Sequence, residues 1–493
     1  MSAERQKNAS YPAHQAKAPS PEKTGQVTAW LHDGPANGDA TVTSSETQEG
    51  TDTGRAPGRA APGVTSKRGI VRVALSSLLG TTIEYYDFLL YGTMAALVFG
   101  TVFFPDSNSG VATIAAFGTL AAGYLARPLG GLIFGHFGDR LGRKRTLVAS
   151  MMLMGVASTL IGFLPGYSSI GIAAPILLIV LRTVQGIAVG GEYGGAALMV
   201  IEHAGKGRRG SWVGIMQLGS PLGGLVAIGA IAAVTRLPEN DFESWGWRIP
   251  FLASALLLIL GLYVRLSVTE SPIFKAATTA DETAAPRIPI IQIFATQKKA
   301  LLLACAVGIG PFAVTALISS HMVAYGTQIG FTRADVVQAL LYTTVVALVT
   351  IPAFSALSDF VGRKPVVLVG AVGAIAWAWP MYAMVGSGSV VNLTVAMMIG
   401  QLTQNLMYSP MAPMLSEMFG TEVRYTGVSL GYQLSSLLGA GFTPMIAAIL
   451  VLSTDGSSVP LVLIMIGAAG ITLAALAVLR EPRGNDLTAK IAV

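Results

Sequence analysis

The chain has 493 residues, of which 52% are hydrophobic and 12% are charged, and its formal net charge is +6. A soluble protein has about twice that share of charged residues, so the composition excludes a string of ordinary soluble domains. The basic residues are scattered among short loops and form no continuous stripe, which argues against a nucleic-acid partner.

Residues 1–66 are rich in Ala, Gly, Pro, Ser and Thr and contain almost no aliphatic clusters. Such a segment cannot bury enough apolar surface to fold, so we expect a disordered tail. The first hydrophobic run starts only near Ile70, which argues against a cleaved signal peptide.

Twelve apolar runs follow, and each is long enough to cross about 30 Å of hydrocarbon as a helix of about 20 residues. We therefore expect an all-α polytopic membrane protein that is embedded in the lipid bilayer. The expected spans are 70–103, 111–135, 146–165, 172–201, 209–234, 247–267, 299–323, 335–357, 365–385, 390–416, 425–452 and 458–479.

Lysine and arginine gather in alternate loops, whereas the intervening loops carry acidic residues such as Asp106, Glu239 and Asp241. By the positive-inside rule, the basic loops lie in the cytoplasm. An even number of spans then places both termini on the cytoplasmic side.

A charged turn after the second expected span recurs after the eighth. The first copy reads Gly135-His-Phe-Gly-Asp139-Arg140-Leu-Gly142-Arg143-Lys144, and the second reads Ser-Asp359-Phe-Val-Gly362-Arg363-Lys364. The null interpretation, an ordinary basic loop, explains the positive charge but not two copies at matching places.

A second pair of residues repeats in the same way. Glu202 and Arg209 follow the fourth span, and Glu417 and Arg424 follow the tenth. Repeated six-span halves are a known plan of secondary transporters, which bind substrate near the middle of the membrane between the halves. The expected organisation is a cytoplasmic tail (1–66), a first six-helix half (67–267), a cytoplasmic linker (268–298), a second six-helix half (299–480) and a C-terminal cytoplasmic tail (481–493).

Aspartate, glutamate, lysine and arginine residues embedded in the spans are confined to the first half. An ionisable group at that depth costs at least about 2.5–3.5 kcal/mol unless it is paired or hydrated, so each is a functional candidate. The alternative is that they form structural ion pairs within the half. The residues are Glu84 and Asp87 in the first span, Arg127 in the second, and Arg182 and Glu192 in the fourth.

The spans of the second half carry neutral polar groups instead. Gln401, Gln404 and Tyr408 follow helical spacing, so they share one face of the tenth span. This face would either line a cavity and position a substrate or hold neighbouring helices together.

A count of charges suggests a mechanism. Three acids and two arginines would leave one uncompensated negative charge, so we expect one acid to take up a proton readily. An arginine whose partner has been protonated can then accept a substrate carboxylate. The candidate proton carriers are Asp87, Glu84 and Glu192, and the candidate substrate-binding residues are Arg127, Arg182, Tyr91, Gln185, Gln401, Gln404 and Tyr408.

Other classes of protein leave no signature. The chain contains no Gly-x-x-x-x-Gly-Lys-Ser/Thr and no His-Glu-x-x-His motif, so we expect neither an enzyme nor an ATP-driven pump. Its one cysteine, Cys305, lies in an apolar run and indicates no metal site.

The turn motifs resemble those of the major facilitator superfamily. The first copy matches in full the motif that this family carries between its second and third spans, and Arg182-Thr-Val-Gln185-Gly186 resembles its fourth-span motif. The resemblance covers about residues 70–480. It implies a fold of two pseudo-symmetric six-helix halves and a cytoplasmic gate formed by Gly135, Asp139, Arg140, Gly142, Arg143, Lys144, Asp359, Gly362, Arg363 and Lys364.

Further stretches resemble the metabolite:proton symporter branch of that family, whose members move shikimate, 2-oxoglutarate, citrate, proline or betaine. They begin at Glu84 (Glu-Tyr-Tyr-Asp-Phe), Arg127 (Arg-Pro-Leu-Gly-Gly), Gly190 (Gly-Gly-Glu-Tyr-Gly-Gly-Ala), Trp245 (Trp-Gly-Trp-Arg-Ile-Pro-Phe) and Glu270 (Glu-Ser-Pro).

This branch implies uptake of a small carboxylate-bearing metabolite by a monomer in the bacterial inner membrane, with the proton as coupling ion and no other cofactor. A zwitterion or betaine symporter is an alternative, and so is a non-transporting membrane sensor with the same fold.

Overall fold

The computed structural model describes residues 67–141, 143–205, 207–267, 289–420 and 423–485. These residues form helices and no strand. The expected tail (1–66), most of the linker (268–288) and the last residues (486–493) lie outside the described residues. So do Gly142 and the side chains of residues 135–144, which carry the first copy of the charged turn.

The first half contains six helical stretches, several of them interrupted. The long stretches are α1 (Lys67–Met94) with η1 (Ala95–Phe99) and α2 (Gly100–Phe103), α3 (Ser109–Leu141), α4 (Arg143–Phe163), α6 (Ala173–Gly190) with α7 (Glu192–His203), α8 (Arg209–Gln217) with α9 (Gly219–Val234), and α11 (Arg248–Ser267). Three short elements lie between them: α5 (Tyr167–Ile170), α10 (Glu239–Asp241) and η2 (Phe242–Gly246).

The second half repeats this plan after the short helix α13 (Pro289–Thr296). Its stretches are α14 (Lys298–Ala316) with η3 (Leu317–His321) and α15 (Met322–Gln328), α16 (Arg333–Val361), α17 (Arg363–Val385), α18 (Val390–Tyr408) with α19 (Met411–Met418), α20 (Arg424–Ser436) with η4 (Leu437–Gly441) and α21 (Thr443–Ser453), and α22 (Val459–Val478).

Most of these stretches suit a membrane. Over the described ranges, nine helices are long and apolar enough to cross a bilayer, or ten if the bent pair Glu239–Gly246 and Arg248–Tyr263 is one span. The other two expected spans, 146–165 and 390–416, are also helical. The apolar part of α4 is shorter (Val148–Phe163), and α18 carries Gln401, Gln404 and Asn405, which lower its apolar character. The expected all-α, two-half fold is confirmed.

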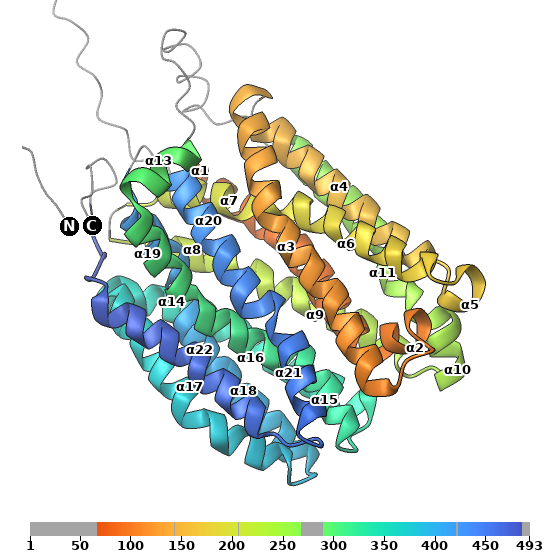
Figure 1. Cartoon of the computed structure of the whole chain (residues 1–493). Helices are drawn as coiled ribbons and strands as arrows, with labels where there is room; N and C mark the ends of the chain where they lie inside the picture. The colour runs from red at the N-terminus through yellow and green to blue at the C-terminus, as the bar shows by residue number, and fades with distance from the viewer. Residues whose placement is uncertain (1–66, 142, 206, 268–288, 421–422, 486–493) are drawn as a thin grey trace, which may run out of the picture. The chain divides into compact units, whose positions relative to one another are not determined.

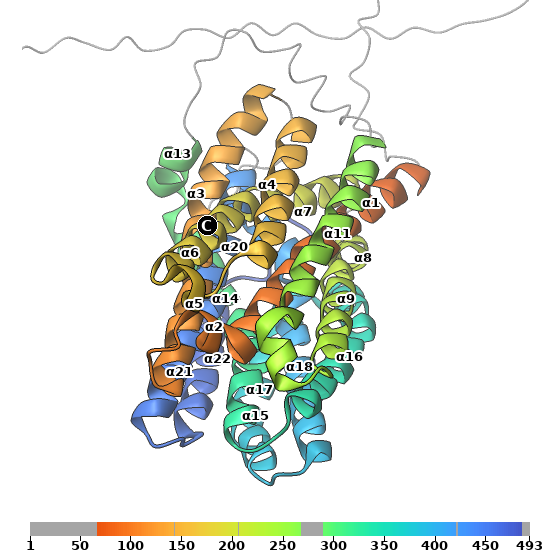
Figure 2. The ribbon, with the colours of Figure 1, turned by 90° about the vertical axis from the view of Figure 1, so that its right-hand side faces the viewer.

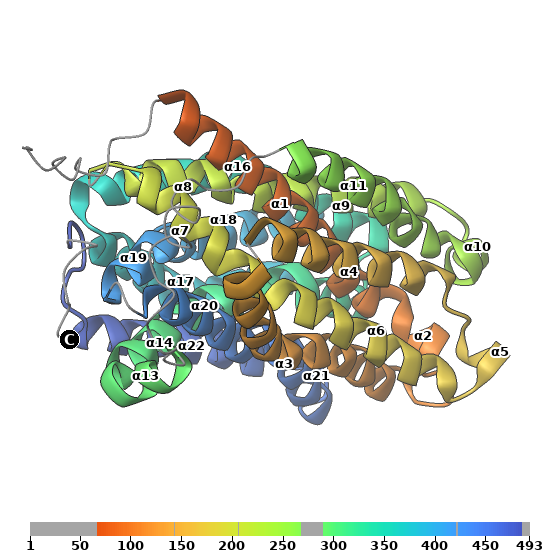
Figure 3. The same ribbon diagram turned by 90° about the horizontal axis from the view of Figure 1, so that it is seen from above.

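The two halves meet along two seams. The helix α16 packs on α8 and α9, while α3 packs on α20 and α21. In Figure 1 the early helices α3, α4 and α6 lie to the right and the late helices α17, α18 and α22 lie to the left. Figure 2 shows α9 beside α16, and Figure 3 shows α3 beside α21. Residues that lie between these seams therefore come from both halves.

Glycines bring α3 and α6 into backbone contact. A Cβ atom on Gly186 would lie 2.0 Å from the carbonyl oxygen of Gly123, and one on Gly190 would lie 1.9 Å from that of Arg127. Only glycine permits such an approach. This contact holds Arg127 of α3 close to Arg182 of α6, beside α1.

Candidate functional site

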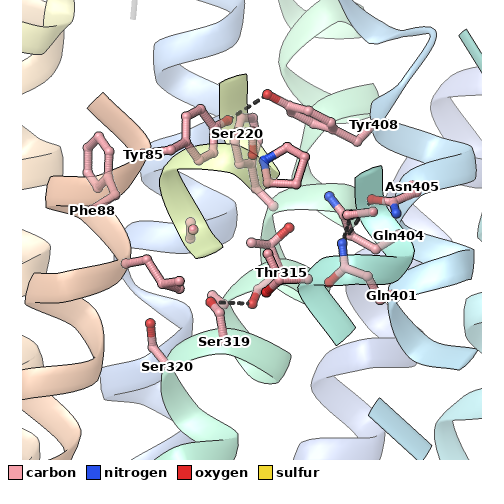
Figure 4. Close-up of a pocket in the computed structure, with 18 of the residues that line it drawn as sticks. Tyr85, Phe88, Ser220, Thr315, Ser319, Ser320, Gln401, Gln404, Asn405 and Tyr408 are labelled. Carbon is pink, nitrogen blue, oxygen red and sulfur yellow. Dashed lines mark hydrogen bonds between the residues drawn. The ribbon is translucent and has the colours of Figure 1, made fainter. Parts of the chain in front are cut away.

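A cavity of about 130 Å³ lies between the halves. Its wall is formed by α1, α3 and α9 from the first half and by α14, η3, α16, α18, α20 and η4 from the second. Figure 4 shows Tyr85 and Phe88 of α1 across this space from Ser319 and Gln401. The volume is close to that of an engineered cavity of about 150 Å³ that holds benzene, so it suits a small molecule.

The first half contributes the charged part of the wall. Glu84 and Arg127 are the charged residues among the described lining residues. The Arg127 guanidinium lies between two rings, 3.8 Å from the ring centroid of Phe88 and 3.7 Å from that of Tyr124.

Arg127 also retains hydrogen-bonding capacity. Its Nη1 donates one long hydrogen bond of 3.5 Å to Ser436 Oγ, while Nε and Nη2 have no hydrogen-bond partner among the described residues. Since the side chain is only 3% exposed, these donors are costly to leave unsatisfied. An anion in the cavity could accept from them.

A second buried group lies just behind this wall. Asp87 forms a 3.3 Å ion pair with Arg182 Nη1, and its Oδ1 accepts a 3.0 Å hydrogen bond from Gln185 and another from Ser158. Arg182 Nη1 also donates to Gln185 Oε1 over 2.9 Å. The helices α1, α4 and α6 thus enclose one carboxylate in a network of donors.

The second half contributes a neutral polar wall. Gln401 Nε2 donates to Gln404 Oε1 and to Asn405 Oδ1, each over 2.8 Å (Figure 4). Asn405 Nδ2 in turn donates to Thr350 Oγ1 over 2.6 Å. Ser319 Oγ donates to the carbonyl of Thr315 over 2.7 Å. These groups can exchange hydrogen bonds with the hydroxyl or carbonyl groups of a ligand.

Tyrosines from both halves meet at one edge of the cavity. The hydroxyl of Tyr85 lies 2.5 Å from that of Tyr408 and 3.1 Å from that of Tyr432. The Tyr432 ring stacks on Tyr193 with centroids 3.5 Å apart. Tyr85, Tyr432 and Tyr193 were not predicted as site residues, because a contact between the two halves leaves no local pattern in the sequence.

The predicted site residues fall into two groups. Glu84, Arg127, Gln401, Gln404 and Tyr408 line the cavity. The others lie away from its wall: Asp87, Arg182 and Gln185 form the buried network, Tyr91 donates to Thr119 over 2.6 Å with its ring 4.1 Å from Arg182, and Glu192 is buried at the start of α7.

The second copy of the charged turn joins the two halves. Asp359 Oδ1 pairs with Arg363 Nη1 at 2.7 Å, and the Asp359 carboxylate accepts from the backbone amides of Gly210 and Ser211, at 2.8 and 2.7 Å. Those amides begin α8, so the carboxylate meets the positive end of a helix from the other half. Gly362, with φ of 107°, makes the turn from α16 to α17.

A second acid extends this cluster. Glu417 pairs with Arg209 of the first half at 3.0 Å and with Arg363 at 3.3 Å. The repeated pairs identified in the sequence therefore contribute a bridge between halves. The candidate gate residues of the second copy, including Lys364, lie at this end, whereas the side chains of the first copy are outside the described ones.

The opposite end of the molecule carries a more exposed bridge. Arg333 at the start of α16 pairs with Glu239 at 3.1 Å and with Glu243 at 3.4 Å. Its guanidinium also lies 5.3 Å from the ring centroid of Phe242. Ion pairs therefore connect the halves on both sides of the cavity.

The fold and the cavity define a class: a membrane transporter whose two helical halves enclose a central space. The chain belongs to the Major Facilitator Superfamily, whose sequence profile matches residues 74–430. The expected family, including its metabolite:proton branch, is thus confirmed.

Relatives of known name support this assignment. The chain is 40% identical to the shikimate transporter of Escherichia coli (strain K12), over 77% of this chain and 87% of that protein. It is 32% identical to the proline/betaine transporter of Salmonella typhimurium (strain LT2), over 81% of each. A crystal structure of a D-xylose-proton symporter shares the fold, with a TM-score of 0.66 and 18% identity over 84% of this chain and 99% of that chain.

Proposed function

We propose that the protein is a proton-coupled symporter, and not an enzyme, that takes up a small carboxylate-bearing metabolite across the bacterial inner membrane. It works as a monomer with both termini in the cytoplasm, and the proton is its coupling ion. The observation that carries the proposal is Arg127, a buried cation in the cavity wall whose Nε and Nη2 donors have no partner among the described residues.

Coupling follows from the charges behind the wall. When Asp87 takes up a proton, its ion pair with Arg182 is lost and the surroundings gain one positive charge. A substrate carboxylate that binds to Arg127 restores the balance. Proton and anion therefore bind more tightly together than either binds alone, which is the requirement for symport.

Movement across the membrane then requires the cavity to open on alternate sides. The Arg209–Glu417 ion pair and the hydrogen bonds from the Gly210 and Ser211 amides to Asp359 close one end, and the pairs of Arg333 close the other. In the proposed cycle, one end separates at a time.

The candidate substrates come from the chemistry of the wall and from the names of the relatives. An anion with hydroxyl groups, as in shikimate, would use Arg127 together with the amides of α18. A zwitterion, as in proline or betaine, is the second candidate, because Glu84 lines the same cavity as Arg127 and could face a cationic group.

The test uses purified protein in proteoliposomes with an imposed inward proton gradient. Uptake of radiolabelled shikimate, 2-oxoglutarate, citrate, proline and glycine betaine is measured with and without a protonophore, and a pH electrode records substrate-induced proton movement. We expect saturable uptake of at least one compound that falls when the gradient is dissipated, together with proton entry.

Uptake that is indifferent to the proton gradient would contradict symport. Binding of a compound without saturable uptake into the vesicles would instead favour a non-transporting sensor. If the protein preferred betaine to every anion tested, a zwitterion and not an anion would be the substrate.

A further inference from the structure

The ring of Phe88 makes cation–π contacts with the buried guanidiniums of both Arg127 and Arg182. Its ring centroid lies 3.8 Å from the Cζ atom of Arg127 and 5.1 Å from that of Arg182. Both distances fall within about 6 Å, the range of an attractive cation–π contact. Phe88 also lines the cavity, so its contact with Arg182 makes it a partition between that space and the Asp87–Arg182 ion pair.

Phe88 lies between two positive charges, Arg127 and Arg182, that are both buried. Two cations that share one ring lie no more than about 9 Å apart, given the two distances above. Their repulsion is weakly screened where water is excluded. The negative ring face attracts both guanidiniums and so holds them in place relative to each other.

Among the described residues, Arg182 and Arg127 are the cations whose charges act on Asp87. Helix α4 presents the Ser158 hydroxyl and α9 contains no ionisable residue. The other titratable side chains on α1 and on the helices packed against it include Glu84, Tyr85, Tyr86 and Tyr91 on α1, Tyr124 on α3, Glu192 and Tyr193 on α7, Arg209 on α8, and Arg248 and Tyr263 on α11.

We propose that Phe88 is the coupling residue of this transporter: its ring transmits the loss of the Asp87–Arg182 ion pair to Arg127, so that protonation and anion binding reinforce each other. The inference rests on the proposed function. Phe88 is a positioning residue, because it acts through Arg127. Without the aromatic face, Arg127 would still attract an anion, but the strength of that attraction would depend less on the protonation of Asp87.

The test compares Phe88→Leu, which keeps the apolar volume and loses the ring, with Phe88→Tyr, which keeps the ring. Phe103→Leu is the matched control, because that buried ring contacts Phe99 and Trp247 and, among the described residues, makes no cation–π contact. The ligand is whichever of the five compounds in the uptake test (the panel) the wild-type protein binds best. Calorimetry measures its dissociation constant for each purified variant between about pH 6 and about pH 8. Repeating the titrations in buffers of different ionisation enthalpy measures the proton uptake that accompanies binding.

We expect wild-type affinity to rise by about 5- to 150-fold as the pH falls, which is the usual range of a coupling factor. Phe88→Leu should reduce that factor by about 2- to 30-fold, as expected from the loss of one buried cation–π contact, while Phe88→Tyr and Phe103→Leu retain it. Phe88→Leu protein that binds anion with the full wild-type pH dependence would overturn this inference alone. Wild-type protein that binds no panel compound, or binds without proton uptake, would overturn the proposed function and this inference with it.

Discussion

At the scale of single residues, the geometry of Arg127 makes a strong prediction. Arg127→Lys keeps the positive charge but loses the flat guanidinium that lies between Phe88 and Tyr124. Hydrogen bonds to charged groups contribute about 1.5–3 kcal/mol each, so anion binding should weaken by about 10- to 150-fold. Calorimetric titration of the purified variant with the preferred panel compound provides the measurement.

The control for this change is Arg248→Lys. Arg248 also stacks on an aromatic ring, with its Cζ atom 4.5 Å from the Trp247 centroid, but it does not line the cavity. We expect this variant to bind substrate as the wild type does. Equal losses in both variants would mean that Arg127 acts on stability and not on binding.

Asp87→Asn tests the origin of the coupled proton. The amide has nearly the shape of the carboxyl group but cannot ionise, so the Arg182 pair is permanently lost. We expect substrate-driven proton entry into proteoliposomes to disappear, while exchange of labelled for unlabelled substrate across the membrane continues.

The matched change is Asp106→Asn in the loop before α3, which should leave both activities unaltered. Proton entry that persists in Asp87→Asn protein would transfer the coupling role to Glu84 or Glu192.

At the scale of helices, the sequence predicted two ionisable acids inside the first span but not where each side chain points. Glu84 and Asp87 are three residues apart, which places them about 60° apart around a helix of 3.6 residues per turn. That rotation is enough for Glu84 to line the cavity while Asp87 turns toward α4 and α6. The three-residue spacing places both acids on one side of α1, but the packing of neighbouring helices decides which groups each side chain contacts.

The face of α18 was easier to predict. Gln401, Gln404 and Tyr408 all line the cavity, because the whole polar side of this helix is directed at the space between the halves. The helix interruptions η1 and η3 were not predicted, since a π-helical turn leaves an apolar run unchanged.

The contact between α3 and α6 predicts the effect of a single methyl group. In Gly186→Ala the new Cβ atom would lie 2.0 Å from a backbone oxygen, which cannot move aside as a flexible side chain would. Overpacking typically costs about 1–3 kcal/mol, so we expect a lower melting temperature and weaker substrate binding, because Arg127 and Arg182 would be displaced. Fluorescence-detected thermal unfolding and calorimetry measure the two effects.

The same chain offers a control for that experiment. Gly467 lies inside α22 and a Cβ atom there would meet nothing within 4 Å. Gly467→Ala should be neutral or stabilising by about 0.5–1 kcal/mol, the usual gain of alanine over glycine in a helix. If Gly186→Ala also proved neutral, the close approach of α3 and α6 would be wrong.

At the scale of the whole molecule, the repeats in the sequence predicted two similar halves but could not show how the halves pair. Glu202 with Arg209 and Glu417 with Arg424 could each have formed a bridge within one half. The structure instead pairs Arg209 with Glu417 across the seam, while Glu202 is exposed. The sequence cannot distinguish the two pairings, because Glu202 and Glu417 occupy equivalent positions in the two halves and each lies seven residues before an arginine.

The buried ion cluster predicts a conformational effect. In Asp359→Asn, the side chain that accepts from the Gly210 and Ser211 amides of the other half loses its charge, while Arg363 keeps Glu417 as its other ionic partner. Hydrogen bonds to charged groups contribute about 1.5–3 kcal/mol each, so the closed conformation should lose stability. We expect this end of the cavity to open more often. The measurement is the labelling rate of Ser220→Cys, a cavity-wall position, in a Cys305→Ala background with a membrane-impermeant thiol reagent.

Glu202→Gln is the control, since that side chain is exposed and should not alter labelling. Unchanged labelling in Asp359→Asn protein would show that this cluster does not keep the cavity closed.

The two bridges between the halves differ in their contact with water, and this makes the protein sensitive to ionic strength on one side only. Arg209 and Glu417 have side chains that are 3% and 0% exposed, whereas those of Arg333 and Glu239 are 28% and 72% exposed. Dissolved salt screens exposed charges over about 8–10 Å at physiological strength and reaches buried pairs much less. Raising the salt concentration in only the compartment that bathes Arg333 should therefore favour opening toward that compartment, whereas the same addition on the other side should have little effect.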